Sequence, residues 1–545
     1  MAKKQEGISR RSFLTGVGAA GALAAVGVAA GCTPDSSTAS TGGTAAGGST
    51  GSWRTPLPVP SPDDVSETVD VDVCVVGGGS SGLGAARSSL LHGAKSVLVL
   101  ERDATSRIGG GVHGVLGSKY AREIGVTFSD EKVDEMIKDE VRMSSMRANE
   151  RYYRIWAQRS EEVFESMLQA FDTTHVHLTN NGAAPYDQLK DEYFSESVFP
   201  GEGIQISAGD VNTPLIEGFT DWINGNGGEI RYSTPGEQLI QESSGKIVGV
   251  YGKKEDGSYI KVNAKAVIVS GGGFEANKEM VAELAPHAIG TNVANTAPGD
   301  GSAISMCVWA GAQTQMSPVC IMMSSAKSPD DPNVPNPIPF ICVNADGNRF
   351  VNEATSSFVI PYSILNQPGK QAWQIFDANY AKSINELKIQ TWMGTIFFDD
   401  EKCKKFEDAA IKADTISELA KKLGINPDGL EAQVKKYDEM TNAGHDDQFG
   451  LPLRFMKYVN PVQPPFYGME IPYNCLVSLG GIICNPDTCE VLDSDRKPIP
   501  GLYATGNSVG ERFGMAYTNN VTGLSNAFGD VMGFIAGESI GKYIS

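Results

Sequence analysis

A glycine-rich segment near the start of the chain has the residue types of a phosphate-binding loop. Gly77–Gly82 reads GGGSSG, a GxGxxG pattern. The first glycine (Gly77) permits a tight turn, the second (Gly79) lets the backbone approach a pyrophosphate, and the third (Gly82) lets a helix pack closely on a strand. Glu101 follows 19 residues after Gly82, where a carboxylate can accept hydrogen bonds from ribose hydroxyls. The spacing therefore predicts a dinucleotide cofactor and the redox chemistry that it carries.

The residues around these glycines predict a strand–helix–strand unit that would position them. Val69–Val76 is a short alternating-to-apolar run typical of a buried parallel strand, and Ser96–Leu100 is a second such run, which ends at Glu101. Leu83–His92 lies between them and is compatible with a helix. The N-terminus of that helix would stabilise phosphate charge. Because all the parts are in order, we expect a ligand-binding loop and not merely a glycine-rich turn.

Two later glycine turns indicate which dinucleotide is bound. The apolar run Lys265–Val269 ends in the turn Ser270–Gly273. Near the C-terminus, Pro500–Asn507 is an apolar strand that ends in glycine, and a helix pattern over Gly523–Tyr543 follows it. A cofactor held by both ends of the chain is large and buried. This favours FAD over a nicotinamide that dissociates.

Cysteine and histidine spacing gives no support for a metal centre. The chain has 9 cysteines and 6 histidines, without CxxC, CxxCH or zincin-like spacing. Cys475, Cys484 and Cys489 form a local cluster whose intervals are too wide for a standard iron–sulfur motif. We therefore expect buried free thiols and no metal ligands. An iron–sulfur cluster stays an alternative that the spacing does not support.

Length and charge limit the class of protein. A chain of 545 residues favours two or more domains. The formal net charge of −20 repels nucleic acid, which is therefore excluded as a partner.

The first 32 residues predict an export signal and not part of the fold. Ser9–Leu14 reads SRRSFL, a twin-arginine signature, and the apolar run Gly16–Ala30 is too short for a convincing membrane span. We therefore expect the twin-arginine translocase as a partner and the extracytoplasmic face of the cell membrane as the location. Cys32 lies in a lipoprotein-like cleavage site, so lipid anchoring and simple cleavage are alternatives. Residues 33–68 are expected to form a flexible linker.

Long motifs across the chain resemble the flavoprotein family of soluble fumarate reductases, urocanate reductases and 3-ketosteroid Δ1-dehydrogenases. They are VVGGGSSGLGAA, KAVIVSGGGFEANKEM, PGDGSAISMCVWAGA, VNADGNRFVNE and IPGLYATGN. The resemblance implies an α/β fold in which a Rossmann-like FAD-binding domain (69–312 and 480–545) is split by an inserted α+β capping domain (313–479). Within the cap, Thr415 and Glu418 form a capping box that predicts a helix over Ile416–Leu423.

The resemblance also implies which residues contact FAD. Besides Gly77, Gly79, Gly82 and Glu101, they are Ser81, Arg102, Gly110, Gly111, Gly272, Asp300, Gly506, Asn507, Gly523, Leu524 and Ser525. His113 lies near the position at which succinate dehydrogenases attach FAD to histidine. The pattern around it is a poor match, so we expect non-covalent FAD.

The chain departs from fumarate reductases at the positions that bind the dicarboxylate. The histidine of the family's His-Pro pair falls at Ser317, the proton-donor arginine at Ser357, and the C-terminal arginine near Asn520. A further family histidine falls within Tyr473–Ser478, which contains none. A buried carboxylate is costly without cationic partners. The four changes therefore predict a neutral substrate.

Three residues are candidates for the lost acid chemistry. Tyr517 stands ten residues before Ala527, a spacing similar to that of the tyrosine that donates to the steroid ketone in 3-ketosteroid dehydrogenases. A hydroxyl can polarise a neutral carbonyl without a counter-charge. Arg512 is the second candidate, although it can equally pair with Glu511. Ser357, at the family's proton-donor position, is the third.

The expected reaction is hydride transfer from reduced FAD to the β-carbon of an activated C=C, with Tyr517 or Arg512 stabilising the enolate. We expect an exported ene-reductase for a neutral, steroid-like α,β-unsaturated carbonyl or lactone, most similar to cardiac glycoside reductases. No haem motif occurs in the chain, so a cytochrome or quinol-linked carrier would supply electrons. The alternatives are a 3-ketosteroid-type dehydrogenase, a fumarate- or urocanate-type carboxylate reductase, and a non-enzymatic FAD electron-relay lipoprotein.

Overall fold

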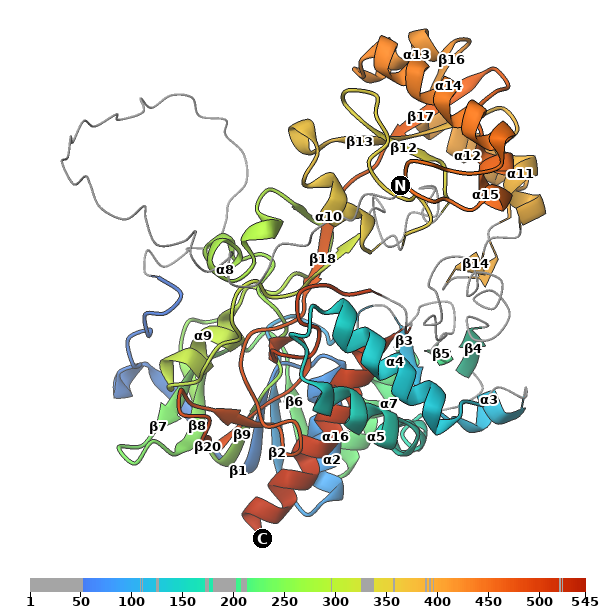
Figure 1. Ribbon diagram of the computed structural model, residues 1–545. Coiled ribbons are helices and arrows are strands. Elements are labelled where there is room, and N and C mark those ends of the chain that lie inside the picture. The colour runs from blue at the N-terminus through green and yellow to red at the C-terminus, as the bar shows by residue number, and fades with distance from the viewer. Residues whose placement is uncertain are drawn as a thin grey trace, which may run out of the picture. The chain divides into compact units, whose positions relative to one another are not determined.

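The computed structural model (Figure 1) describes residues 52–107, 109, 111–123, 127–171, 176–179, 202–206, 213–295, 297–324, 338–355, 358–387, 390–391, 394–395, 397–518, 521 and 523–545. The twin-arginine segment and Cys32 lie outside these residues. In the described part of the chain, no helix combines the length and the apolar character needed to cross a bilayer.

An eight-stranded sheet forms the core of the larger α/β part and confirms the predicted fold class. Its strands, in order across the sheet, are β19 (Glu490–Leu492), β20 (Pro498–Ala504), β9 (Tyr259–Val269), β1 (Val65–Val76), β2 (Val97–Leu100) and β6 (Gly228–Arg231), while β8 (Ile247–Lys253) pairs with β9, and β7 (Gly236–Gln241) pairs with β8. Strands β20, β9, β1, β2 and β6 are parallel. The final four residues of β1 and all of β2 are buried, as expected of parallel strands that are covered on both faces.

Two helices from opposite ends of the chain pack together beside this sheet. They are α2 (Ser80–Leu91) and α16 (Leu524–Ile544), drawn in blue and red in Figure 1. Most of α16 is apolar on every side and buried, which is typical of a core helix. At Gly533, an added Cβ would lie 2.6 Å from the Ser81 carbonyl oxygen, and the Ser88 hydroxyl donates to the Phe534 carbonyl at 2.7 Å. The small residues therefore permit a close approach of the two backbones.

The sequence between β9 and β19 contributes a second sheet with its own hydrophobic cluster. Its antiparallel strands are β12 (Ile341–Asn344), β13 (Ala372–Asp377), β17 (Phe466–Glu470) and β16 (Ile411–Ala413). Helices α11 (Tyr380–Leu387), α12 (Asp400–Ala409), α13 (Ile416–Leu423), α14 (Pro427–Ala443) and α15 (Leu453–Val459) contribute to that cluster. Helix α13 has the predicted bounds, and the Thr415 hydroxyl accepts a hydrogen bond from the Glu418 N–H.

Smaller elements complete the described chain. Two three-stranded sheets consist of β3 (Val112–Val115), β5 (Glu202–Ile206) and β4 (Val176–Thr179), and of β10 (Asn292–Val293), β18 (Asn474–Ser478) and β11 (Ile321–Ser324), and a hairpin consists of β14 (Gln390–Thr391) and β15 (Gly394–Thr395). The other helices are α3 (Lys119–Glu123), α4 (Asp130–Met143), α5 (Glu150–Leu168), α7 (Thr213–Gly225), α8 (Lys278–Leu284), α9 (Ser302–Trp309) and α10 (Ile360–Ile364), with 3₁₀ turns η1 (Pro62–Asp64), η3 (Pro286–Ala288), η4 (Pro368–Lys370) and η5 (Gly506–Ser508).

The structure corrects the predicted end of the flexible linker. Strand β1 begins at Val65, and the Trp53 side chain is buried. The Trp53 indole donates to Glu283 at 2.9 Å, and its carbonyl accepts from the Trp309 indole at 3.0 Å. Arg54 stacks on the Trp53 ring and also binds Glu283. A single large aromatic residue therefore anchors the chain before the first strand, which the Ser- and Gly-rich composition upstream does not indicate.

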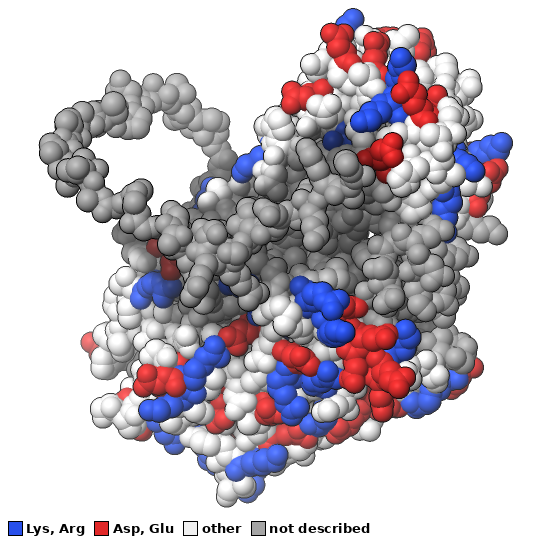
Figure 2. All heavy atoms as spheres, in the orientation of Figure 1, with Lys and Arg blue, Asp and Glu red and all other residues white. Residues whose placement is uncertain are grey.

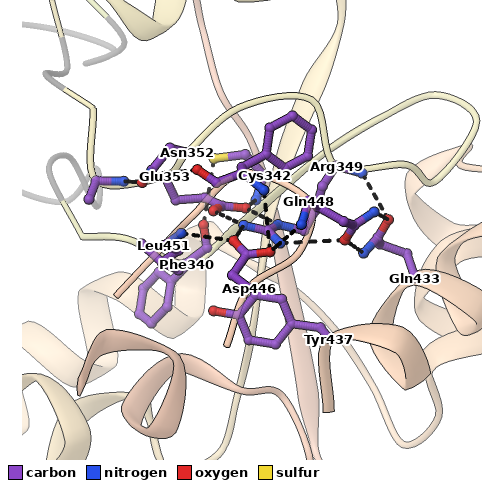
Figure 3. Close-up of polar contacts among 12 residues, drawn as sticks. Phe340, Cys342, Arg349, Asn352, Glu353, Gln433, Tyr437, Asp446, Gln448 and Leu451 are labelled. Carbon is purple, nitrogen blue, oxygen red and sulfur yellow. Dashed lines mark hydrogen bonds and ion pairs between the residues drawn. The ribbon is translucent and has the colours of Figure 1, made fainter. Parts of the chain in front are cut away.

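A buried ionic network ties together the loops beside the second sheet (Figure 3). The Arg349 guanidinium donates to Glu353 at 2.7 and 2.6 Å and to Asp446 at 3.0 and 2.9 Å, and none of these three side chains is exposed. Burial alone would raise the pKa of Asp446, but hydrogen bonds from Arg349 and from the Leu451 and Gln448 N–H groups lower it to about 2. In this structure Arg349 is a structural residue that holds a turn.

Charged side chains of both signs are mixed on the face shown in Figure 2. Exposed pairs among the described residues include Arg151 with Asp487 and Arg159 with Glu162. Exposed pairs contribute little to stability, on the order of 0–1 kcal/mol each.

Candidate cofactor and active site

Four parallel strands end at one edge of the large sheet, and their loops form the candidate site. After β1, the Gly77 N–H donates to the Leu100 carbonyl of β2 at 2.9 Å. After β9, the Ser270 N–H donates to Val76 of β1 at 2.7 Å, and after β20 the Thr505 N–H donates to Val269 of β9 at 3.0 Å. Ligands of open α/β sheets bind outside the carboxyl ends of the strands. The topology therefore brings three glycine turns together that are far apart in the sequence.

The first turn has the tight geometry that its glycines predict. Gly77 has φ +103°, and a Cβ there would lie 2.6 Å from the Ser270 carbonyl oxygen. A Cβ at Gly82 would lie inside van der Waals distance of the Gly77 carbonyl. Beside Gly79, by contrast, the nearest atom to an added Cβ is 3.6 Å away. The loop is thus closed against the protein at its first and third glycines, whereas a Cβ at the second would make only an ordinary contact, with the Arg107 carbonyl oxygen.

This loop leads into a helix whose first backbone N–H groups have no side-chain acceptor. Helix α2 begins after Gly79, which has no side chain to cap it, whereas α4, α5, α8, α12, α13 and α14 are each capped by a side-chain oxygen. The Glu101 carboxylate at the end of β2 accepts from the Gly78 N–H at 2.6 Å and from the Asp103 N–H at 2.8 Å. N–H groups without a capping side chain, beside a carboxylate, suit a pyrophosphate and a ribose.

The second turn carries a buried acid that sequence reasoning missed. Glu275 is 5% exposed, and its carboxylate accepts from the Gly299 N–H, the Ser478 N–H and the Ser478 hydroxyl at 2.7 to 3.0 Å. It thereby fixes the turn containing Gly272 to the loop before Asp300. An added Cβ at Gly272 would meet no atom within 4 Å, so space is open there. The sequence signal that could have identified Glu275 is an acidic residue two positions after the last glycine of GGGFE.

The third turn places Asn507 between the other two. An added Cβ at Gly506 would lie 3.1 Å from the Ser81 Cβ, and the Ser508 hydroxyl donates to the Gly272 carbonyl at 2.7 Å. Asn507, between Gly506 and Ser508, is half-buried. Its Oδ1 accepts from Arg512 Nη2 at 3.3 Å and from the Ser525 hydroxyl at 3.5 Å.

Several predicted cofactor residues are engaged with the protein itself. Arg102 pairs with Asp300 at 2.9 Å, so two predicted contacts hold each other. The Ser81 hydroxyl donates to the Gly529 carbonyl at 2.8 Å. Ser81 can therefore contact a ligand through its backbone N–H and not through its side chain. Leu524 is buried in the hydrophobic core. These residues lie in the segments that border the site, but their side chains pair with or pack against other parts of the protein.

Helix α16 begins at the site and connects it to β3. Gly523 is in the left-handed conformation before the helix, and its carbonyl accepts from the Gly114 N–H. Asn526, which sequence reasoning also missed, donates through Nδ2 to the Gly109 and Val112 carbonyls at 2.9 Å. These bonds hold the strand after Gly111, while Gly110 lies outside the described residues.

His113 of β3 is held by a carboxylate. Its Nδ1 lies 2.5 Å from Asp530 Oδ2, and the Ser80 hydroxyl donates to the other oxygen of Asp530 at 2.8 Å. His113 is fully buried. The His113–Asp530–Ser80 chain therefore ties β3 and α16 to the start of α2.

These donors and openings fit FAD. The strand ends supply N–H groups at an uncapped helix, a carboxylate for hydroxyl groups, and open space beside Gly272. A second uncapped N-terminus, that of the 21-residue helix α16, opens at the same loops. Both favour negative charge on a ligand.

Two of the three candidate acids, Tyr517 and Arg512, lie beside the same aromatic ring. Tyr517 is 4% exposed and makes edge-to-face contacts with Phe513 and Phe358 at centroid distances of 5.2 and 5.7 Å. The Arg512 guanidinium carbon lies 5.3 Å from the centroid of the Phe513 ring. Tyr517 and Arg512 therefore both contact the Phe513 ring.

Arg512 differs from the prediction in its surroundings. It does not pair with Glu511, which binds Arg496 at 2.8 Å instead. Its side chain is completely buried, and burial lowers its pKa to about 10. Nε donates to the Val509 carbonyl at 3.0 Å, and Nη1 has no hydrogen-bond partner among the described residues. A cation sealed in this way is poorly placed to donate a proton to a substrate.

The remaining predicted positions are distributed as follows. Ser357 and Asn520 lie outside the described residues. Ser317 is exposed, and its carbonyl accepts from Arg147 at 3.1 Å. In Tyr473–Ser478, Ser478 is the fully buried partner of Glu275. The described residues contain no group of three His, Cys, Asp or Glu side chains that could hold a metal ion, and their eight cysteines are free.

Comparison with known proteins supports FAD as the cofactor. The family model "FAD binding domain" matches residues 72–524. The chain is 26% identical over 489 residues to a probable fumarate reductase, Ifc3, of Shewanella frigidimarina, covering 88% of this chain and 76% of that protein. It is 26% identical over 505 residues to vinyl phenol reductase of Lactiplantibacillus plantarum, covering 87% and 96%.

Solved structures share the fold. The open conformation of a flavocytochrome c3 fumarate reductase matches with a TM-score of 0.68 at 24% identity, over 91% of this chain and 83% of that one. A 3-ketosteroid-Δ4-(5α)-dehydrogenase from Rhodococcus jostii RHA1 matches with a TM-score of 0.67 at 22% identity, over 88% and 99%.

Proposed function

Because the chain belongs to the FAD-binding domain family and is an FAD-dependent oxidoreductase acting on C=C or CH–CH bonds, we propose that it reduces the C=C of a neutral substrate. The substrate class is a steroid-like α,β-unsaturated carbonyl or lactone, such as the lactone of a cardiac glycoside. We further propose that the protein is exported through its twin-arginine signal to the outer face of the cell membrane.

The observation that carries the proposal is the kind of acid at the site. Tyr517, packed between Phe513 and Phe358, is a neutral donor, and Arg512 beside it is sealed from solvent. A carboxylate substrate would need an accessible cation as its partner. A ketone or lactone oxygen needs only a hydrogen-bond donor. The relative named vinyl phenol reductase also carries the name of an uncharged substrate.

In this proposal the residues of the chain bind, orient and polarise. Bound FAD supplies the hydride. The Tyr517 hydroxyl donates a hydrogen bond to the carbonyl oxygen of the substrate and so stabilises the negative charge that develops there. The apolar rings of Phe513 and Phe358 exclude water from that hydrogen bond, which strengthens it. Electrons come from a separate cytochrome or quinol-linked carrier, in line with the flavocytochrome among the similar structures.

The reverse reaction is the second candidate. The chain has Gly506–Asn507 after its last strand and a tyrosine at position 517, as the resemblance to 3-ketosteroid dehydrogenases implies, and the fold match to such an enzyme supports it. A dehydrogenase would reduce its FAD when given a saturated 3-ketosteroid.

One anaerobic experiment separates these functions. The FAD of the purified holoprotein is reduced with dithionite and mixed with single acceptors, and its reoxidation is followed by absorbance. We expect fast reoxidation by an unsaturated steroid lactone such as digoxin and none by fumarate or urocanate. Reoxidation by fumarate alone would contradict the proposal. FAD reduction by a saturated ketosteroid would favour the dehydrogenase, and reoxidation by a cytochrome alone would favour an electron relay.

Tyr517→Phe is expected to lower kcat by roughly 100-fold with the active acceptor, because one donor to a developing oxyanion is worth about 3 kcal/mol. KM should change little, since the hydroxyl contributes most in the transition state. The matched control is Tyr467→Phe, which alters a buried tyrosine packed on Phe376 in the second hydrophobic cluster and should leave kcat unchanged. Equal kcat values for Tyr517→Phe and wild type would remove Tyr517 from the mechanism.

A further inference from the structure

Arg512 carries a buried positive charge that the described residues do not neutralise. Its side chain is completely buried, and no carboxylate of the described residues lies within ion-pair distance of it. The nearby groups that modify its pKa are Tyr152, Tyr153, Cys320 and Cys484, all of which are neutral when protonated. A buried cation without a partner costs several kcal/mol of folding free energy, on the order of the desolvation penalty of one ion. Such a residue calls for a reason other than stability.

The hydrogen bonds of Arg512 point to Asn507. Nη2 donates to Asn507 Oδ1 at 3.3 Å, while Nε is occupied by the Val509 carbonyl. Because arginine can only donate, the oxygen of the Asn507 amide and not its nitrogen must face Arg512. The Ser525 hydroxyl approaches the same oxygen at 3.5 Å. The orientation of this amide is therefore fixed by Arg512, because the Ser525 hydroxyl could equally accept a hydrogen bond.

The other end of the Asn507 amide is available to a ligand. Nδ2 of Asn507 has no hydrogen-bond partner among the described residues. It is also not one of the buried atoms that lack a partner, in contrast to Nη1 of Arg512. Asn507 is half-buried and stands where the three glycine turns meet, beside Gly506 and Ser508. An amide held in this way keeps its N–H donors for a ligand at the three turns, with the positive charge of Arg512 on its oxygen side.

We propose that Arg512 is a positioning residue that acts through Asn507: it fixes the Asn507 amide as a donor to FAD and favours the reduced, more negatively charged cofactor. Arg512 touches neither substrate nor cofactor in this arrangement, in contrast to its predicted role as proton donor. The proposal rests on FAD binding alone and is independent of the substrate proposed above.

The test measures the midpoint potential of FAD in the substrate-free holoprotein by anaerobic titration. For Arg512→Met we expect at least a tenfold loss in the preference for reduced over oxidised FAD, which corresponds to about 30 mV lower potential for a two-electron couple. The urea midpoint of unfolding should stay equal or rise, because exchanging a buried unpaired ion for an apolar side chain is often neutral or stabilising. If Arg512 were merely structural, Arg512→Met would leave the FAD potential unchanged and lower the urea midpoint of unfolding.

A double-mutant cycle tests whether the effect passes through Asn507. We expect Asn507→Ala to lower the potential and the Asn507→Ala/Arg512→Met pair to lower it no further. Arg512→Lys keeps the charge but cannot reach both Val509 and Asn507, so an intermediate potential is expected. Arg496→Met, which removes the exposed partner of Glu511, is the control and should leave the potential unchanged.

Three outcomes would overturn the proposal. One is an unchanged potential in Arg512→Met with lower stability, which would make Arg512 a structural anchor. Another is an additive shift in the double variant, which would mean that Arg512 acts without Asn507. If Arg512→Met does not fold, Arg512→Lys decides, and a wild-type potential in that variant overturns the proposal. Because none of these measurements uses a substrate, they stand apart from the acceptor panel.

Discussion

Gly82→Ala is expected to yield a protein that purifies almost free of FAD. The added methyl group would overlap the Gly77 carbonyl and lie 3.3 Å from the Ser270 Cβ, so α2 must move away from the first glycine turn. Its N-terminal N–H groups then no longer meet the pyrophosphate. We expect FAD affinity to fall by roughly 100-fold, about 2.7 kcal/mol, measured from flavin fluorescence on titrating the apoprotein.

Gly84→Ala, two residues later in the same helix, is the matched control. An added Cβ there would lie 4.0 Å from the nearest atom, Phe219 Cε2, an ordinary contact. Alanine in place of glycine inside a helix is expected to stabilise by roughly 0.5–1 kcal/mol, with unchanged FAD affinity. Full flavin content in Gly82→Ala would show that the close approach of α2 to the turn is not needed for cofactor binding.

Arg349→Met is expected to destabilise the part of the chain that contains the second sheet by about 3–5 kcal/mol, because it leaves two buried carboxylates, Glu353 and Asp446, without their cation. The measurement is urea unfolding followed by the fluorescence of Trp373, which is buried in β13. Lys422→Met, which removes an exposed pair with Glu418, is the control and should change stability by less than about 0.5 kcal/mol.

The pH dependence of this effect has a definite sign. The pKa of Asp446 is lowered to about 2 in the folded protein from an ordinary value of 3.8, so its contribution to stability is present above 3.8 and is lost as the pH falls toward 2. The deficit of Arg349→Met should therefore be largest at neutral pH and shrink on acidification. Arg349→Met/Glu353→Gln/Asp446→Asn should recover part of the loss at pH 7. A deficit that does not vary with pH would mean that lost packing, and not unpaired charge, causes it.

The sequence predicted those features whose geometry depends only on residues close together in the chain. The bounds of α13 follow from Thr415 and from the residues that it caps. Gly77 and Gly82 could be assigned because each glycine in the pattern has a local steric reason. The parallel arrangement also followed from apolar runs such as Val73–Val76, which only a sheet covered on both faces can bury.

Contacts between distant segments could not be derived in the same way. The sequence around Glu275 does not indicate that its partners are Ser478 and Gly299. Likewise, the sequence around Arg512 does not indicate that the adjacent residue, Glu511, forms its ion pair with Arg496. Arg512 is completely buried, and the groups that act on its pKa come from α5 (Tyr152 and Tyr153) and from the segment before β11 (Cys320), far away in the sequence. Spacing identifies a residue that could act, whereas its exposure decides whether it touches the ligand.

The arrangement of β20 and α16 has a consequence for biosynthesis. Strand β20 pairs with β9, and α16 packs on α2, so residues near position 500 and beyond complete a sheet and a helix layer begun near position 65. Until they emerge from the ribosome, β9 presents an open strand edge, which is a hazard for aggregation. These contacts have a large sequence separation and form slowly. A nascent chain that stops before position 507 lacks the Asn507 turn, so cofactor loading must wait until β20, this turn and α16 have been synthesised.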